Sequence, residues 1–556
     1  MSAAAEFDFI VVGAGSSGCV LANRLSEGGR YSVALIEAGP RDRNLWIHLP
    51  IGYGKTMWDS RVNWRFNTEP EANMGGRRIY WPRGRVLGGC SSINGLIVVR
   101  GQPEDYDGWE ALGNDGWSWR DVLPYFRKLE ANEEFADDQL HGSNGPLSVT
   151  SIGRKNELIE AVIGAAENCG VPRTEDFNGA SQEGVGYYQL TTRNGWRSST
   201  AVAYLRPAEQ RANLTIFTEM QVTRVLFEDR RATGIEFRNK GQAGSLRARR
   251  GVILSAGAVQ SPQLLMLSGL GPAEHLRQHG VPVLADLPGV GGNLQDHLQI
   301  RLIYRCTKPI TTNDQLRSLL GRARLGLEWL LFRTGALAIG INQGGLFTRV
   351  LPESETPDIQ FHIATLSADM AGGKVHDFPG FTLSVCQLRP ESTGTISLAS
   401  PDPLEPPQIV ANYLEAETDR RCAVAAVRFA RKLAGTEPLS DYVAEEMLPG
   451  KAQQSDAELL DFARHHGATI FHPAGTCRMG PAEDRDAVVD PRLRVRGVDG
   501  LWVVDCSIMP RLVSGNTNVP AIMIGEKAAD MIREDVETPS RRREWQDRQE
   551  DWRTAI

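Results

Sequence analysis

The chain has 556 residues, of which 41% are hydrophobic and 23% are charged, and its formal net charge is −7. These values are typical of globular proteins, and the negative balance excludes the basic surface that a nucleic-acid-binding protein needs. At roughly 150 residues per domain the length suggests three or four domains, but the order of the segments described below favours two.

The amino-terminal segment predicts a βαβ unit. Residues 7–12 are an apolar, β-rich run, a glycine turn follows, residues 19–27 have helical spacing, and residues 32–37 indicate a second buried strand. These elements follow one another within about 30 residues, which is the size of a dinucleotide-binding unit.

The glycine turn matches the G-x-G-x-x-G pattern at Gly13, Gly15 and Gly18. The glycines allow the tight turn, the close approach of the backbone to a pyrophosphate, and the close packing of the helix. Glu37 ends the second strand, where a carboxylate can accept hydrogen bonds from a ribose hydroxyl. The pattern predicts dinucleotide binding, and both FAD and NAD use such a turn.

The remaining elements alternate between two kinds of structure. Residues 41–150 are rich in Gly, Pro, Trp and Asn and predict an extended, loop-rich excursion. Residues 214–257 predict strands that return to the first sheet, and residues 300–480 predict a mixed domain with its own sheet. Residues 501–510 predict one more buried strand, and residues 519–534 predict a closing helix.

Segment 316–341 is the most apolar candidate for a membrane span, but four arginines and a glutamate interrupt it. It therefore does not cross a bilayer. Its apolar residues recur at helical spacing, which we interpret as a core-facing helix, with a membrane-surface helix as the alternative. These residues are Leu316, Leu319, Leu320, Ala323, Leu327, Leu330 and Leu331.

Cysteine usage and the amino-terminus indicate the compartment. The eight cysteines form no CxxC pair, and we expect free thiols in a reducing cytoplasm. The amino-terminus has no basic region, and its apolar run leads directly into the glycine turn. We therefore expect no signal peptide and a cytoplasmic location, with peripheral contact to the inner membrane as the alternative.

A second run of small residues extends from Gly88 to Asn94. Small residues let backbone N–H groups approach a planar ring or a phosphate closely. The alternative is a tight surface turn. The run follows Pro82 and Arg83 in a long loop, and a functional role would explain the length of that loop.

The stretches 83–101 and 257–271 resemble the two signature segments of the glucose/methanol/choline oxidoreductases, a family of FAD enzymes. The first departs from the family pattern only at Cys90. The resemblance covers residues 7 to about 535 and is nearest to bacterial choline-dehydrogenase-like, aliphatic alcohol and sorbose dehydrogenases; segments 176–189 and 198–208 resemble the sorbose dehydrogenases. Further matching segments are 37–39, 289–297, 471–480, 503–510 and 515–527.

The resemblance implies an α/β fold in which a Rossmann-like FAD-binding domain carries a second mixed domain with its own antiparallel sheet. Both domains are discontinuous in sequence. We predict residues 7–160, 195–300 and 488–536 for the FAD-binding domain, residues 161–194 and 301–487 for the substrate-binding domain, and residues 537–556 for a polar tail.

The resemblance also implies the residues that bind FAD. Asn94 and Gly95 would lie beside the isoalloxazine, and the backbone of Val222 would contact adenine. Some family members attach FAD through a histidine at the position of Ile93; because isoleucine cannot form that bond, we predict non-covalent FAD. The predicted cofactor residues are Gly13, Gly15, Ser16, Ser17, Gly18, Glu37, Ala38, Arg83, Gly88, Gly89, Ser92, Asn94, Gly95, Val222, Ala256, Asp505 and Asn516.

Oxidation of an alcohol by a flavin needs a group that takes the hydroxyl proton, and histidine suits this task near neutral pH. His472 ends an apolar run at the entry to a loop, a setting that a core histidine could share, and the resemblance assigns it as the base. The resemblance makes Asn516 its partner, which would bind the substrate oxygen; helix N-capping is the alternative role. For Asp296 and His297 we expect a structural role near the cofactor.

The predicted activity is oxidation of an alcohol, with a small-molecule substrate and an electron acceptor that is oxygen or a quinone or dye. We expect no nucleic-acid partner. We also expect no metal, because His465, His466, His472 and Cys477 lack the spacing of a zinc site.

Fatty-acid photodecarboxylases share this fold and lack the base, so His472 argues against that activity. A non-catalytic flavoprotein is the third alternative. Aliphatic, benzylic, polyol and choline substrates all stay open.

Overall fold

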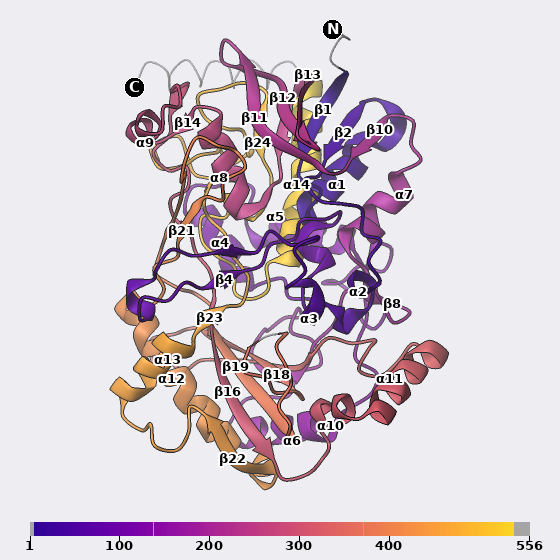
Figure 1. The fold of residues 1–556 in the computed structure, drawn as a ribbon, viewed down its shortest axis with the longest axis vertical. Coiled ribbons are helices and arrows are strands. Elements are labelled where there is room, and N and C mark those ends of the chain that lie inside the picture. Colours follow the sequence, from indigo (N-terminus) through magenta and orange to yellow (C-terminus); the bar gives the residue numbers. More distant parts are fainter. Residues whose placement is uncertain (1–4, 137, 371, 539–556) are drawn as a thin grey trace.

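The computed structural model describes residues 5–136, 138–370 and 372–538. Most of the predicted polar tail, residues 539–556, lies outside the described residues. Figure 1 shows two bodies stacked along the long axis, with the amino-terminal α/β unit above and a second sheet with its helices below.

The upper body is built on a sheet whose buried strands run parallel, with an antiparallel extension at one edge. In spatial order the strands are β10 (Leu214–Phe217), β2 (Val33–Ile36), β1 (Glu6–Val12), β13 (Gln242–Leu254), β12 (Arg231–Asn239) and β11 (Met220–Glu228), and β24 (Leu501–Val503) also pairs with β13. Strands β2 and β24 and the second half of β1 are continuous runs of buried residues, as expected when helices or loops cover both faces.

Helices from distant parts of the chain cover this sheet. Helix α1 (Ser16–Ser26) packs against α14 (Asn518–Glu537), so the last helix of the described chain begins beside the glycine turn (Figure 1). Other helices of this body are α3 (Tyr53–Thr56), α4 (Pro103–Ala111), α5 (Trp119–Leu129), α8 (Gly257–Leu267) and α9 (Ala273–Gln278).

The lower body is built on an antiparallel sheet. Helices α6 (Glu157–Asn168), α12 (Glu417–Ala434) and α13 (Asp456–His466) contribute to the hydrophobic core on one face. In spatial order the strands are β22 (Val443–Leu448), β16 (Leu298–Cys306), β19 (Gly380–Gln387), β18 (Ile359–Ala364), β17 (Asn342–Thr348) and β7 (Gly184–Tyr187), and β23 (Ala468–Thr469) also pairs with β16.

The predicted α/β class, with a Rossmann-like unit and a second mixed unit, is confirmed by these two sheets. The domain boundaries stay predictions. Helix α6 and strand β16 belong to the lower body and begin three or four residues before the predicted boundaries at 161 and 301, since Leu158 and Ile300 already lie in its core.

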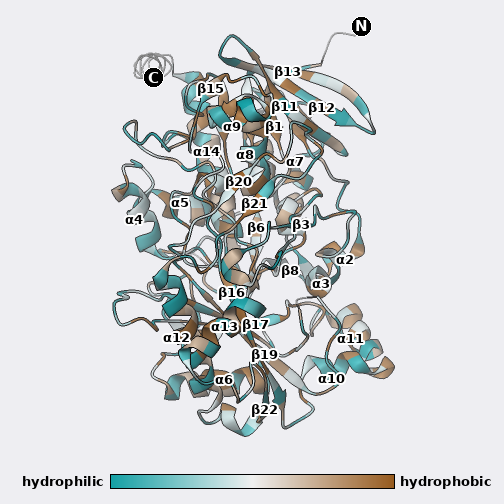
Figure 2. Ribbon diagram, turned by 60° about the vertical axis from the view of Figure 1, so that its left-hand side comes forward, coloured by the Kyte–Doolittle hydropathy of each residue, from teal (hydrophilic) through white to brown (hydrophobic). Residues whose placement is uncertain are grey.

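The interpretation of segment 316–341 as core-facing is wrong. Helix α11 (Leu319–Phe332) buries only Leu325, while Leu319 and Leu320 are more than 80% exposed. Figure 1 shows α11 beside α10 (Thr312–Arg317) at the edge of the lower body, away from the core that α6 and α12 already cover. Figure 2 shows hydrophobic colour on this peripheral helix. The membrane-surface alternative stays a prediction.

Among the described residues, no helix combines the length and the apolar character that crossing a bilayer requires. All eight cysteines are free.

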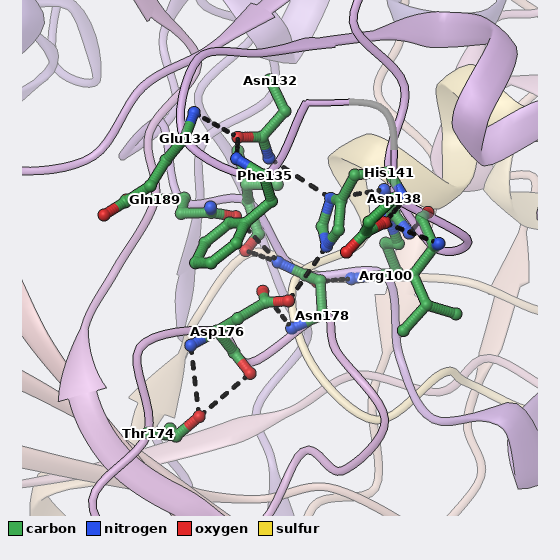
Figure 3. A network of polar contacts seen from close by, with 12 residues as sticks. Arg100, Asn132, Glu134, Phe135, Asp138, His141, Thr174, Asp176, Asn178 and Gln189 are labelled. Atoms are coloured by element: carbon green, nitrogen blue, oxygen red, sulfur yellow. Dashed lines mark hydrogen bonds and ion pairs between the residues drawn. The ribbon is translucent and has the colours of Figure 1, made fainter.

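A buried polar network ties the long excursion to the segment between α6 and β7 (Figure 3). His141 is fully buried, its Nδ1 lies 3.1 Å from Glu130 Oε1, and its Nε2 lies 2.9 Å from Asp176 Oδ2. Burial lowers the pKa of His141, but the hydrogen bonds to Asp176 and Glu130 outweigh burial and raise the pKa to about 9. Only the imidazolium can donate to both carboxylates.

We expect His141→Gln to destabilise the protein by roughly 3 kcal/mol at pH 6, because the variant removes one partner of a buried ion pair. The pKa of His141 is higher folded than unfolded, so its contribution is complete below about pH 6.5 and is lost as the pH rises through about 9. Thermal unfolding of both proteins at pH 6 and pH 9.5 measures this, with exposed His465→Gln as the control. An equal loss of Tm at both pH values would contradict the assignment.

Candidate active site

The backbone of the glycine turn is packed so closely that it leaves no room for a side chain at Gly13 or Gly18. Gly13 has φ = +98°, and a Cβ on Gly18 would lie 1.9 Å from the carbonyl oxygen of Gly13. Gly15 is the N-cap of α1 and supplies no capping side chain, so the first N–H groups of the helix stay available to an anion. This is the geometry that receives a pyrophosphate.

The second small-residue run packs directly on this turn. A Cβ on Gly89 would lie 2.7 Å from Cα of Gly15, and the N–H of Gly88 donates to the carbonyl of Ala14 at 2.7 Å. Residues about 75 positions apart therefore meet only because both loops carry glycine there.

Glu37 stands at the end of β2, beside the turn. Its carboxylate accepts the N–H groups of Ala14 at 3.0 Å and Gly39 at 2.8 Å. Burial raises its pKa to about 7. The carboxylate lines the cavity next to Ala38 and keeps acceptor capacity for a ribose hydroxyl.

One continuous cavity extends from this turn to His472. Three predicted cofactor residues, Gly18, Gly88 and Ser92, do not line it; Gly18 packs on Gly13, and the Ser92 hydroxyl donates to the carbonyl of Leu87 at 2.7 Å. The predicted residues that do line it are Gly13, Gly15, Ser16, Ser17, Glu37, Ala38, Arg83, Gly89, Asn94, Gly95, Val222, Ala256, His472, Asp505 and Asn516.

Two of these side chains, Asp505 and Arg83, form hydrogen bonds that hold neighbouring loops in place. Asp505 accepts the N–H of Gly257 at 2.8 Å and the hydroxyl of Ser261 at 2.6 Å, which joins the end of β24 to the start of α8. Arg83 donates to the carbonyl of Phe471 at 2.6 Å, so it holds the backbone directly before His472.

The backbone at His472 is strained and anchored. Phe471 has φ = +74°, a region that costs energy for a bulky side chain and that occurs often at functional sites. The N–H of His472 donates to Asp296 Oδ1 at 2.7 Å, and Asp296 also accepts the hydroxyls of Tyr413 and Thr469. Burial raises the pKa of Asp296 to about 6.

A hydrogen-bond chain from one side fixes the tautomer of His472. His297 Nε2 lies 2.9 Å from the carbonyl oxygen of Leu388, which can only accept, so His297 carries its proton on Nε2. Its Nδ1 is then a lone pair, and His472 Nδ1, 3.0 Å away, must donate to it. His472 is left with a lone pair on Nε2.

A second chain, from the other side, leads to the same tautomer. The Tyr188 hydroxyl donates to the carbonyl of Phe361 at 2.7 Å, and Gln360 Nε2 donates to Tyr188 at 2.8 Å and to Asn516 Oδ1 at 3.0 Å. The amide of Asn516 therefore presents Nδ2, a donor, to His472 Nε2 at 3.1 Å. Two independent chains that end on backbone carbonyls both require an unprotonated Nε2.

The electrostatic surroundings keep both histidines neutral. Burial, with repulsion from His297, His362 and Arg83, places the pKa of His472 well below its usual value. Burial lowers the pKa of His297 to about 4. A neutral imidazole with an unprotonated Nε2 in a cavity can accept a proton from a ligand that takes the place of the Asn516 N–H as its hydrogen-bond donor.

Three contributors were missed by the sequence analysis or given another role. His297 contacts His472 directly, beyond the structural role expected for it, and Gln360 orients Asn516. Arg197 is buried and donates to the carbonyls of Ser91 and Asn94, which fixes the predicted flavin loop. Arg197 directly precedes the matching segment 198–208, which was the only signal for it.

Asn516 does not cap a helix. Helix α14 begins at Asn518 and its N-cap is Thr517, so the capping alternative for Asn516 is wrong and its side chain serves the His472 network instead. Within the described part of the chain, no group of three or more His, Cys, Asp or Glu side chains could hold a metal ion.

Comparison with known proteins covers almost the whole chain. The GMC oxidoreductase family models match residues 7–299 and 390–525. The chain is 43% identical to an oxygen-dependent choline dehydrogenase of Brucella suis and 42% identical to an alcohol dehydrogenase [acceptor] of Pseudomonas putida, with 95% of each chain covered in both cases. The structure of pyridoxine 4-oxidase from Mesorbium loti superposes with a TM-score of 0.85 at 31% identity, covering 94% of this chain and 98% of that one.

Proposed function

The chain belongs to the GMC oxidoreductase family of FAD-dependent enzymes that act on CH–OH donors, and we propose that His472 and Asn516 carry out its reaction. The observation that supports this proposal is the pair of hydrogen-bond chains that both require an unprotonated Nε2 at His472.

The cavity suits FAD at its glycine-lined end. The uncapped amino-terminus of α1 and the glycines Gly13, Gly15 and Gly89 would receive the pyrophosphate, Glu37 would hold a ribose, and Val222 would contact adenine. Asn94 and Gly95 line the same cavity and would contact the flavin ring. When bound, FAD supplies an acceptor, N5, for the hydride that leaves the carbinol carbon.

The protein residues manage the hydroxyl group. The substrate hydroxyl would donate to His472 Nε2, which takes its proton as the C–H bond breaks, while an N–H of Asn516 binds the oxygen. The proton that His472 accepts creates an imidazolium whose Nδ1–H stays bonded to His297. The substrate loses one proton and one hydride, and an aldehyde or ketone forms.

The identity of the electron acceptor distinguishes a dehydrogenase from an oxidase. We propose a dehydrogenase that passes electrons to a quinone or dye, with an oxidase that reduces oxygen to hydrogen peroxide as the alternative. A panel of alcohols tested with oxygen and peroxide detection, and again with an artificial dye, distinguishes the two. Anaerobic bleaching of the flavin by a primary alcohol tests the function itself, because a non-catalytic flavoprotein would keep its colour.

A photodecarboxylase is the remaining alternative from another class. The retention of His472 with a complete tautomer network argues against it, since that reaction needs no base for a hydroxyl proton. Release of carbon dioxide from a fatty acid under blue light, without oxidation of any alcohol, would favour this alternative.

We expect FAD to be held without a covalent bond. Ile93 lines the cavity and offers no nucleophile. Acid precipitation of the holoenzyme should therefore release all the yellow colour into the supernatant. Cys90 and Cys506 also line the cavity, so flavin that stays in the pellet would contradict the prediction, and Cys90→Ala and Cys506→Ala variants would identify which thiol holds it.

A further inference from the structure

A row of polar side chains crosses the inner face of the lower sheet. Arg301 on β16 pairs in register with Ser384 on β19, and Ser384 pairs with His362 on β18. All three line the cavity that contains His472 and Asn516. Paired residues have Cβ atoms about 5 Å apart, so the row leads from the catalytic pair outward to Arg301.

Side chains alternate between the two faces of a strand, and this alternation puts the row on the cavity side of the sheet. On β18, Ile359, Phe361 and Ile363 point into the hydrophobic core, so His362 points to the opposite face. On β16, Ile300 and Leu302 lie in the same core and leave Arg301 on the cavity side.

The guanidinium of Arg301 makes no hydrogen bond and no ion pair with a described residue. Arg301 is partly buried and faces the cavity, and burial lowers its pKa. Asp369 attracts it only at longer range; that carboxylate is 90% exposed and lies 3.0 Å from His376 Nε2. A partly buried cation without a partner is stabilised by a ligand that supplies the opposite charge.

Carboxylates are missing from this end of the cavity. Among the described residues that line it, only Glu37 and Asp505 are acidic, and both accept backbone N–H groups at the glycine-lined end. The substrate end holds the arginines Arg83 and Arg301 instead. Its charge is therefore suited to an anion and unsuited to a quaternary ammonium group.

Two further donors, Tyr53 and His362, line the same cavity. The Tyr53 hydroxyl accepts the N–H of Ile341 at 3.3 Å and donates to no described residue, and burial raises the pKa of Tyr53 to about 12, which keeps it a donor. His362 is 1% exposed, and neither of its ring nitrogens has a hydrogen-bond partner. Burial lowers the pKa of His362 to about 3, so the ring is neutral and one of its nitrogens carries a proton that it can donate.

We propose that Arg301, with Tyr53, binds a carboxylate of the substrate, so that the enzyme prefers hydroxy acids to neutral or cationic alcohols. His362 and Arg301 stand two strands apart, roughly 10 Å between backbones. Several carbons or an aromatic ring therefore separate the carbinol from the acid. This inference rests on the proposed function and narrows its substrate class.

The test compares 4-(hydroxymethyl)benzoate with 4-(hydroxymethyl)benzamide, its neutral counterpart, and with choline. In a second pair, 6-hydroxyhexanoate is compared with its methyl ester. We expect the wild type to have a kcat/KM at least ten-fold higher for each acid. Arg301→Gln should lower kcat/KM for the acids roughly 10- to 100-fold and change it less than three-fold for the neutral compounds. Arg301→Lys should keep part of the preference.

Arg305→Gln is the matched control, since Arg305 lies on the same strand, outside the cavity lining, over the ring of Phe378. Binding of 4-methylbenzoate to the oxidised holoenzyme, followed by the flavin spectrum, needs no turnover and should weaken at least ten-fold in Arg301→Gln. Equal kcat/KM for acids and neutral compounds, or unchanged 4-methylbenzoate binding, would overturn the proposal. If no alcohol reduces the flavin, the proposed function fails, and the 4-methylbenzoate titration still decides the role of Arg301.

Discussion

His472→Ala is expected to lower kcat by roughly 100- to 10,000-fold, the usual contribution of a general base, while the variant stays yellow with bound FAD. The imidazole of His472 is buried. The hydrogen bond from the backbone N–H of residue 472 to Asp296 does not depend on the imidazole, so it should keep the loop in place in the variant. Steady-state turnover with an alcohol that the wild type oxidises, together with the flavin content of both proteins, measures the effect.

The control for this variant is His465→Ala, because His465 is exposed on α13. It should keep wild-type turnover. Near-normal kcat in His472→Ala would exclude His472 as the base, and loss of FAD from the variant would show that His472 instead supports the cofactor site.

His297→Leu is expected to lower kcat by roughly 10- to 100-fold with little change in KM. Leucine removes the acceptor for His472 Nδ1–H, so the imidazole loses the contact that fixes its proton on Nδ1 and its lone pair on Nε2. Loss of the group that orients a catalytic histidine can cost up to about 10,000-fold in other enzymes. The second chain through Asn516 remains, so we expect a smaller effect here.

His297→Gln is the matched rescue variant, because an amide oxygen can accept from His472 Nδ1 and an amide N–H can donate to Leu388. It should recover part of kcat. A merely structural role for His297 predicts a different pattern, in which both variants lose stability and FAD together and kcat per bound flavin is unchanged. That pattern would refute the positioning role.

Sequence alone determined the parts of this protein that depend on local backbone geometry. Gly13, Gly15 and Gly18 could be recognised because a tight turn with φ > 0 and close helix packing demands glycine whatever surrounds it. The α/β class followed from the apolar periodicity of short segments. His472 and Asn516 were identified by the resemblance of their flanking motifs to a known family, and their roles stay proposals.

Tertiary structure alone decided which distant side chains share the cavity. Arg301, Ser384 and His362 form one row because of the register between strands that are 22 to 83 positions apart, and no local pattern reports that register. The same holds for the exposed apolar residues of α11: helical spacing defines a face, but neighbouring elements decide whether anything covers it. The tautomer of His472 likewise depends on carbonyls of Leu388 and Phe361, which reach the site only through folding.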